Sequence, residues 1–170
     1  MFEAPVLGVD PGVASVGLAA VARRDRSPAL LWASTVRTPS DLPEAQRLRR
    51  LHEAVRSAIS EHRPSSVAVE SVRWNKNTSS AMAVARATGV VVLAAGEAGL
   101  PVEEYGPLEV KMAVTGQGNA SKDQVRVALE RLHGLRDVPA QPDAADAVAV
   151  ALCHLLQSRM RAVARRVALR

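Results

Sequence analysis

The sequence predicts one mixed α/β domain: a five-stranded sheet, its first three strands antiparallel and the others parallel, with helices on both faces. Three short apolar runs separated by turn residues open the chain, between residues 6 and 36. Helical patterns and apolar runs alternate from residue 40 onward. The 170 residues are 48% hydrophobic and show no repeat or linker, so they provide for a single core.

The three opening runs are expected to form an antiparallel meander. The first, residues 6–9, ends at Asp10, and Asp10-Pro11-Gly12 is a turn signal before the second run, residues 15–21. The charged residues 23–26 connect the second run to the third, residues 29–36.

Helical spacing replaces the apolar runs after Ser40. The apolar residues at this spacing are Leu48, Leu51, Val55 and Ile59. They predict a helix that is capped by Ser40 or Asp41, has Pro43 near its start and is broken by Pro64.

Beyond Pro64, strands again alternate with helices. We expect, in order, a buried strand at residues 67–70, a polar loop at 73–78, an alanine-rich helix at 79–98, a strand at 102–105 and a short helix at 109–114. Ser121 caps the next helix, which carries Val125, Leu129 and Leu132.

The last predicted helix begins near Pro142 and runs to about Ser158. It is apolar on nearly every side, which predicts burial. Five arginines and no acid follow Ser158, so residues 1–158 hold 17 basic and 17 acidic residues and the net charge of +5 belongs to the tail. We therefore divide the chain into a single domain, 1–158, and a basic tail, 159–170, which either binds phosphates or is a solvated, frayed helix end.

The composition excludes two classes of protein. The only cysteine is Cys153, so the chain is no disulfide scaffold. No apolar run approaches the ~20 residues that span a bilayer, and the first residues carry no export signal. We expect a cytoplasmic protein without a membrane segment.

Carboxylates follow two of the predicted strands. The runs at 6–9 and 67–69 stop at Asp10 and Glu70, and parallel neighbouring strands would place both acids at one edge of the sheet. Asp143 and Asp146 lie three residues apart on one face of the first turn of the last helix. Four such acids at one place would repel one another or bind Mg²⁺ or Mn²⁺, ions that activate water in phosphodiester hydrolysis.

Each acid also has a simpler interpretation. Asp10 would start a turn, and Asp143 would interact with the positive end of its helix dipole. Glu70 would be an exposed residue at the end of a strand. Asp146 fits this interpretation least, because the rest of its helix is apolar. The order of elements leaves two architectures open, the ribonuclease-H-like fold and half of an actin-like kinase.

Four blocks in the same order and spacing resemble the RuvC Holliday-junction resolvases. They are Val6-Leu7-Gly8-Val9-Asp10-Pro11-Gly12 with Gly17; Val69-Glu70 with Asn77, Ser80-Ala81 and Gly89-Val90; Glu109-Val110-Lys111 with Gly118-Asn119-Ala120-Ser121-Lys122-Asp123-Gln124-Val125; and Asp143-Ala144-Ala145-Asp146-Ala147 with His154. The resemblance covers residues 5–157 and is specific because all four blocks agree.

This resemblance implies a ribonuclease-H-like, homodimeric endonuclease that nicks two strands of a four-way DNA junction in recombination and repair. It places Asp10, Glu70, Asp143 and Asp146 on the family's metal-binding acids, with two Mg²⁺ ions per site or Mn²⁺ as a substitute. It places Lys111 and Lys122 near the junction backbone. It also implies a branch-migration complex with RuvA and RuvB.

The loop after Glu70 departs from the family pattern. Where the family has an aromatic wedge, this chain has Arg73, followed by Trp74. Either side chain could stack on a base, or Trp74 could pack on a partner subunit. Lys76 and Asn77 are predicted DNA contacts in the same loop. Before Gly89, the family's arginine is replaced by Thr88, with Arg86 two positions earlier, while His154 and Cys153 are expected to be structural core residues.

Three other functions stay open at this point. An actin-like kinase or ATPase needs two lobes around its nucleotide, and the chain is long enough for one. A junction-binding module without catalysis would not need all four acids. A ribonuclease-H-like nuclease could act on RNA–DNA hybrids instead.

Overall fold

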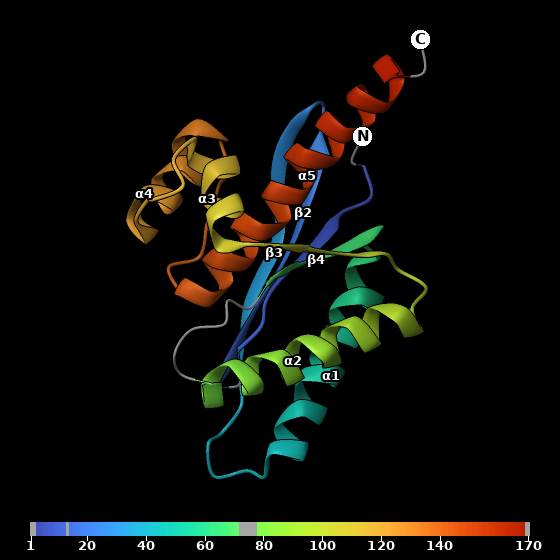
Figure 1. Ribbon diagram of the computed structural model, residues 1–170, viewed down its shortest axis with the longest axis vertical. Coiled ribbons are helices and arrows are strands. Elements are labelled where there is room, and N and C mark those ends of the chain that lie inside the picture. Colours follow the sequence, from blue (N-terminus) through green and yellow to red (C-terminus); the bar gives the residue numbers. More distant parts are fainter. Residues whose placement is uncertain (1–2, 13, 72–77, 169–170) are drawn as a thin grey trace.

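The computed structural model describes residues 3–12, 14–71 and 78–168, with side chains in all of these except 78–80 and 159–168. It contains a five-stranded sheet in the order β3-β2-β1-β4-β5 (Figure 1). The strands are β1 (Val6–Asp10), β2 (Ser15–Arg24), β3 (Ser27–Arg37), β4 (Ser66–Glu70) and β5 (Val102–Tyr105). β1, β2 and β3 are antiparallel neighbours, and β4 pairs parallel with both β1 and β5. The predicted mixed sheet is confirmed.

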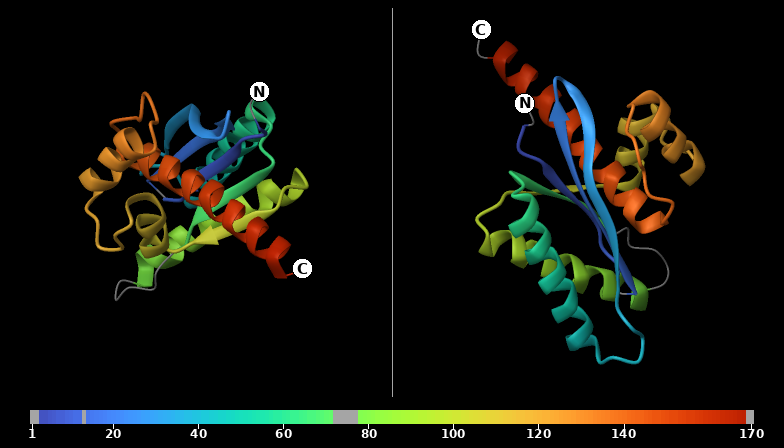
Figure 2. Two further views of the ribbon diagram at one scale, coloured as in Figure 1. Left: turned by 90° about the horizontal axis from the view of Figure 1, so that it is seen from above. Right: turned by 180° about the vertical axis from the view of Figure 1, so that it is seen from behind.

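Helices cover both faces of this sheet, as predicted (Figures 1 and 2). They are α1 (Glu44–His62), α2 (Thr78–Glu97), α3 (Pro107–Thr115), α4 (Lys122–Val127), the π-helix η1 (Ala128–Leu132) and α5 (Pro142–Ala168). One buried cluster lies between the sheet and α1 and α2, and a second lies under α3, α4 and α5. None of the helices in the described parts of the chain is both long and apolar enough to cross a membrane.

Three local predictions were wrong or incomplete. The N-cap of α1 is Pro43, without a side-chain hydrogen bond, so neither Ser40 nor Asp41 caps it. The Ser121 cap is present with its capping box, but the helix changes to a π-helix at Ala128, which leaves Leu132 69% exposed while Leu129 is buried. Helix α5 continues to Ala168, beyond the predicted end, because no glycine or proline follows Ser158.

Two glycines let α5 lie directly on the sheet. A Cβ atom at Gly17 in β2 would be 1.8 Å from the Asp143 carbonyl oxygen, and one at Gly8 in β1 would be 2.1 Å from the Ala147 carbonyl oxygen. Any larger residue would therefore collide with the helix backbone. This close approach brings the first turn of α5 to the ends of β1 and β2, and it thereby positions Asp143 and Asp146.

Candidate active site

Asp10 and Glu70 lie side by side at the carboxyl edge of the sheet. β1 and β4 are parallel with Val9 opposite Val69, so the next residue of each strand is an acid. The two carboxyl groups share a hydrogen bond, in which Asp10 holds the proton. The predicted pairing of these strand ends is thus present in the fold.

The first turn of α5 brings two more acids to the same edge. The Ser15 hydroxyl at the start of β2 donates a hydrogen bond of 2.6 Å to Asp143 Oδ2. The Lys122 ammonium at the start of α4 donates one of 2.6 Å to Asp146 Oδ2. Each α5 carboxylate is therefore held by a residue from a different element.

Burial and, after it, the charges of neighbouring acids raise the pKa values of Asp10 and Glu70. Burial, then the charges of Glu70, Asp146 and Asp143, raise the pKa of Asp10 to about 7. Burial, followed by the charge of Asp146, also raises the pKa of Glu70, against a lowering by the Asp10 hydrogen bond and by nearby lysines. The protonated forms of Asp10 and Glu70 are therefore favoured relative to free carboxyl groups.

A hard divalent cation fits this donor set, because all four residues are acids that offer carboxylate oxygens and lie close enough to act on the pKa of Asp10. Among the described residues, however, no three His, Cys, Asp or Glu side chains already form a group that could hold a metal ion. In this state one oxygen of each α5 acid is engaged, because Ser15 binds Asp143 and Lys122 binds Asp146. The four acids are close enough to interact electrostatically, but the described residues do not yet form a complete metal-binding site.

Lys111 and Lys122, the two lysines predicted to lie near the DNA backbone, border the acids. A cavity of about 240 Å³ lies beside them, lined by Glu70, Pro107, Val110, Lys111, Lys122, Val125, Asp146, Ala149 and Val150. Lys111 and Lys122 both lower the pKa of Glu70 by their positive charge. The hydrogen-bonded ion pair with Asp146 raises the pKa of Lys122, and burial lowers it by less. The net pKa is raised, so the ammonium stays charged. Lys122 stands at the start of α4, where the helix dipole disfavours a cation, and the contact with Asp146 offsets that penalty.

The other predicted DNA contacts fall on a loop outside the described residues: Arg73, Trp74, Lys76 and Asn77. Arg86, by contrast, is described. Its guanidinium binds both oxygens of Glu44 at 2.7 and 2.8 Å and so joins α2 to α1.

The expectation of a structural role for His154 and Cys153 agrees with their surroundings. His154 contacts the hydroxyls of Ser66 and Tyr105 through its two ring nitrogens, at 3.1 and 2.9 Å. Cys153 is fully buried.

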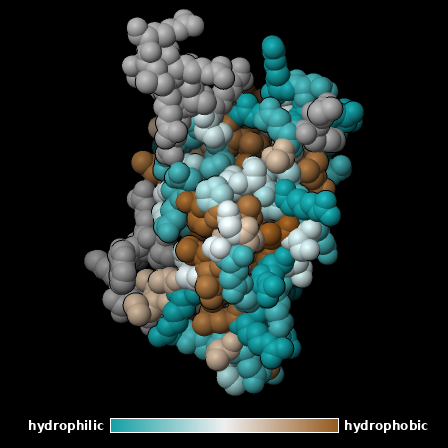
Figure 3. All heavy atoms as spheres, turned by 90° about the vertical axis from the view of Figure 1, so that its right-hand side faces the viewer, coloured by the Kyte–Doolittle hydropathy of each residue, from teal (hydrophilic) through white to brown (hydrophobic). Residues whose placement is uncertain are grey.

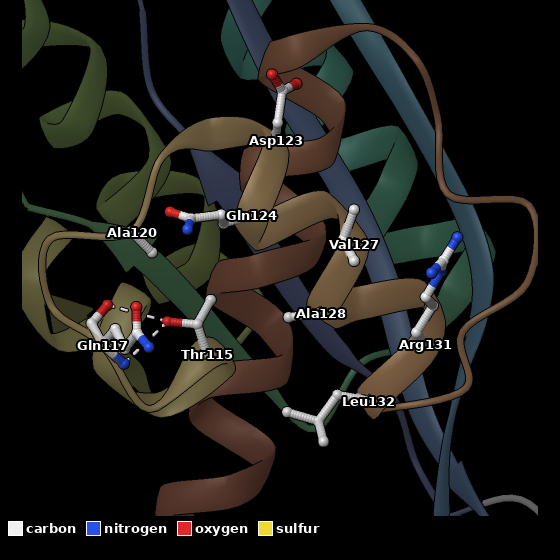
Figure 4. Close-up of a pocket in the computed structure, with 9 residues that line it drawn as sticks. All are labelled: Thr115, Gln117, Ala120, Asp123, Gln124, Val127, Ala128, Arg131 and Leu132. Carbon is white, nitrogen blue, oxygen red and sulfur yellow. Dashed lines mark hydrogen bonds between the residues drawn. The ribbon is translucent and has the colours of Figure 1, made fainter.

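A larger cavity lies away from the acids. Its volume is about 370 Å³, and its lining residues are Thr115, Gln117, Ala120, Asp123, Gln124, Val127, Ala128, Arg131 and Leu132 (Figure 4). Its lining combines apolar side chains with one acid and one arginine, and none of the four predicted site acids is among them. Size alone therefore does not identify the site in this chain.

Ser15 is the site residue that sequence reasoning missed. A serine beside a turn gives no local signal, because its partner Asp143 is 128 residues away. We expect Ser15→Ala to lower activity about tenfold, since the carboxylate of Asp143 loses the contact that orients it. Stability should change by less than about 1 kcal/mol. Steady-state cleavage rates and urea unfolding test this, with Ser15→Thr as the control that keeps the hydroxyl; a full rate in Ser15→Ala would contradict the role.

Comparisons with known proteins show the family of the chain. The family model described as crossover junction endodeoxyribonuclease RuvC matches residues 6–154. A relative of that name from Pelotomaculum thermopropionicum is 46% identical over 149 residues, 88% of this chain and 91% of the relative. The structure of Thermus thermophilus RuvC in complex with a Holliday junction substrate is 37% identical and superposes with a TM-score of 0.86, covering 93% of this chain and 96% of that one. The yeast mitochondrial Holliday junction resolvase Ydc2, at 12% identity and a TM-score of 0.66, shares the fold.

Proposed function

Because the chain belongs to the family of the crossover junction endodeoxyribonuclease RuvC, we propose that it resolves four-way DNA junctions by hydrolysing one phosphodiester bond in each of two strands. One observation above all supports the hydrolysis. Asp10, whose pKa is raised to about 7, lies among three further carboxylates at the carboxyl edge of a parallel strand pair. Such a concentration of negative charge is unfavourable for folding, so a function has to account for it.

In our proposal, the negative charge of the four acids binds divalent metal ions. Asp10, Glu70, Asp143 and Asp146 would hold them, with two Mg²⁺ per site and Mn²⁺ as a substitute. When bound, the ions supply activation of the attacking water and stabilisation of the leaving 3′-oxygen. The acids come from two strands and one helix, so their oxygens are held on rigid elements rather than on loops.

The chain's own cations would bind the DNA backbone. Lys111 on α3 and Lys122 on α4 line the cavity beside the acids, where their ammonium groups can contact phosphates on either side of the cleaved bond. We assign Arg73, Trp74, Lys76 and Asn77 to contacts with the junction bases and backbone. The tail, 159–170, would add phosphate contacts beyond the nuclease domain, 1–158.

A homodimer would present two such sites to the two equivalent strands of a junction. Helix α2 offers an apolar face for it: Met82 and Leu93 are 45% and 56% exposed and, eleven residues apart, lie on the same side of the helix. Figure 3 shows one face of the molecule, on which apolar side chains reach the surface between hydrophilic ones. A complex with RuvA and RuvB, and a location with the chromosomal DNA in the cytoplasm, complete the proposal.

Cleavage of matched DNA substrates tests the proposed function. The purified protein is incubated with end-labelled four-way junction, linear duplex of the same sequence and RNA–DNA hybrid, with Mg²⁺, with Mn²⁺ and with EDTA. We expect symmetric paired nicks in the junction alone, and no product in EDTA.

Each other outcome names a different activity. Cleavage of the hybrid but not of the junction would identify a nuclease of another substrate class. Junction binding without any product, under both metals, would identify a binding module. Products in EDTA would contradict the role of the acids as metal ligands.

A further inference from the structure

Lys122 links the start of α4 to Asp146, one of the acids of α5. Its ammonium lies 2.6 Å from Asp146 Oδ2, while the side chain of Asp146 is 24% exposed and that of Lys122 is 70% exposed. The lysine thus reaches inward from solvent to a largely covered carboxylate. Holding the solvated ammonium of a lysine in one position costs side-chain conformational entropy. The attraction to Asp146 therefore has to outweigh that cost.

The start of α4 holds Lys122 in place for this contact. Ser121 and Gln124 form a complete capping box, with hydrogen bonds of 3.2 and 2.8 Å, so the backbone of the intervening Lys122 is fixed. A cation at this position opposes the helix dipole. The attraction toward the acids has to exceed that penalty, and the charges of Asp146, Asp10 and Asp143 all favour the ammonium form.

We propose that Lys122 is a built-in cation of the metal-free site, and that its ammonium and the divalent ion compete for the carboxylate of Asp146. The proposal rests on the proposed function, since it takes Asp146 as a metal ligand. It accounts for two observations together: the acids are gathered, yet the described residues contain no three that could hold a metal as they stand.

The exchange gives Lys122 two positions with different roles. In the first, the ammonium neutralises Asp146 and reduces repulsion among the acids while no metal is bound. In the second, it is displaced toward the cavity that Lys111 also lines, where a DNA phosphate would receive it. Metal binding would thus prepare a phosphate contact, and a phosphate that attracts the lysine would in turn favour metal binding.

Mn²⁺ binding without DNA tests the competition directly. Isothermal titration calorimetry compares the full-length protein with Lys122→Gln and with Lys111→Gln. We expect Lys122→Gln to bind Mn²⁺ about two- to fivefold more tightly, because a partly exposed ion pair no longer has to be broken. Lys111→Gln also removes a positive charge near Glu70 but leaves the ion pair between Lys122 and Asp146 in place, so the Mn²⁺ affinity of this variant should change by less than about twofold.

The Asp146→Asn variant separates two hypotheses: that Asp146 is a metal ligand, and that Lys122 competes with the metal for it. In a double-mutant cycle, Lys122→Gln should leave Mn²⁺ affinity unchanged when residue 146 is already Asn. If Asp146→Asn alone does not weaken Mn²⁺ binding, the metal-site assignment fails. If it weakens binding but Lys122→Gln has no effect, or if both lysine variants tighten binding equally, the assignment stands and the competition is wrong.

A spectroscopic measurement follows the lysine itself. The ¹H–¹³C signal of the Lys122 Cε methylene, identified by its loss in Lys122→Gln, should shift during a Mg²⁺ titration with the midpoint of metal binding. The Lys111 signal serves as the internal reference and should shift less. A Lys122 signal that stays unchanged while metal binds would overturn the proposal.

Discussion

Asp10→Asn is expected to reduce junction cleavage by at least about a thousandfold while leaving junction affinity within about threefold of the original protein. The substitution keeps a hydrogen-bond donor for Glu70 but removes the carboxylate that is central to the proposed metal site. Single-turnover cleavage and gel-shift titration, with Mg²⁺ and Ca²⁺ respectively, give the two quantities. Asp41→Asn, an exposed aspartate on a loop, is the matched control and should be fully active.

The same substitution should stabilise the metal-free protein above neutral pH. The folded protein holds the Asp10 proton up to about pH 7, whereas the unfolded chain releases it near 3.8. The Asp10 contribution to the free energy of unfolding is therefore complete below about pH 4 and is lost as the pH rises to 7, by at most about 4 kcal/mol. In Asp10→Asn this part of the pH dependence disappears.

Urea unfolding in EDTA at pH 5 and pH 8 measures this difference. We expect Asp10→Asn to exceed the original protein by about 1–3 kcal/mol at pH 8 and by much less at pH 5. Equal stabilities at pH 8 would mean that burial and the neighbouring acids do not raise the pKa of Asp10 in the folded protein. Loss of cleavage with gain of stability is the pattern of a site that is kept for its function.

Gly17→Ala should unfold the protein or destabilise it by about 3 kcal/mol or more. The added Cβ would lie 1.8 Å from the carbonyl oxygen and 2.3 Å from the carbonyl carbon of Asp143, and these backbone atoms cannot rotate away. Any folded fraction has to move the first turn of α5, so its cleavage rate should fall by at least about tenfold.

Gly96→Ala provides the control for Gly17→Ala. Gly96 is exposed in α2 and a Cβ there meets nothing within 4 Å, so alanine should stabilise the helix by about 0.5–1 kcal/mol. Thermal unfolding of both variants at one pH gives the comparison. A Gly17→Ala protein within about 1 kcal/mol of the original, with a full cleavage rate, would show that α5 does not depend on this close approach.

Most elements of the fold follow from local sequence signals. The strand at Val102–Tyr105 and the Ser121 cap lie where the pattern predicts them. The wrong predictions concern boundaries that local propensity does not decide, such as the cap at Pro43 and the π-helix at Ala128. At the second of these boundaries Leu129, the second residue of the π-helix, is fully buried.

The sequence by itself predicted the four acids of the candidate site, because apolar runs that stop at Asp10 and Glu70, and acids one helical turn apart at Asp143 and Asp146, are local patterns. Only the tertiary structure decided what those acids contact. Ser15 meets Asp143 and Lys122 meets Asp146 across 128 and 24 residues of chain, and Gly17 admits the helix that makes the first contact possible. Such contacts depend on how closely a helix and a sheet approach in space, which no spacing along the chain encodes.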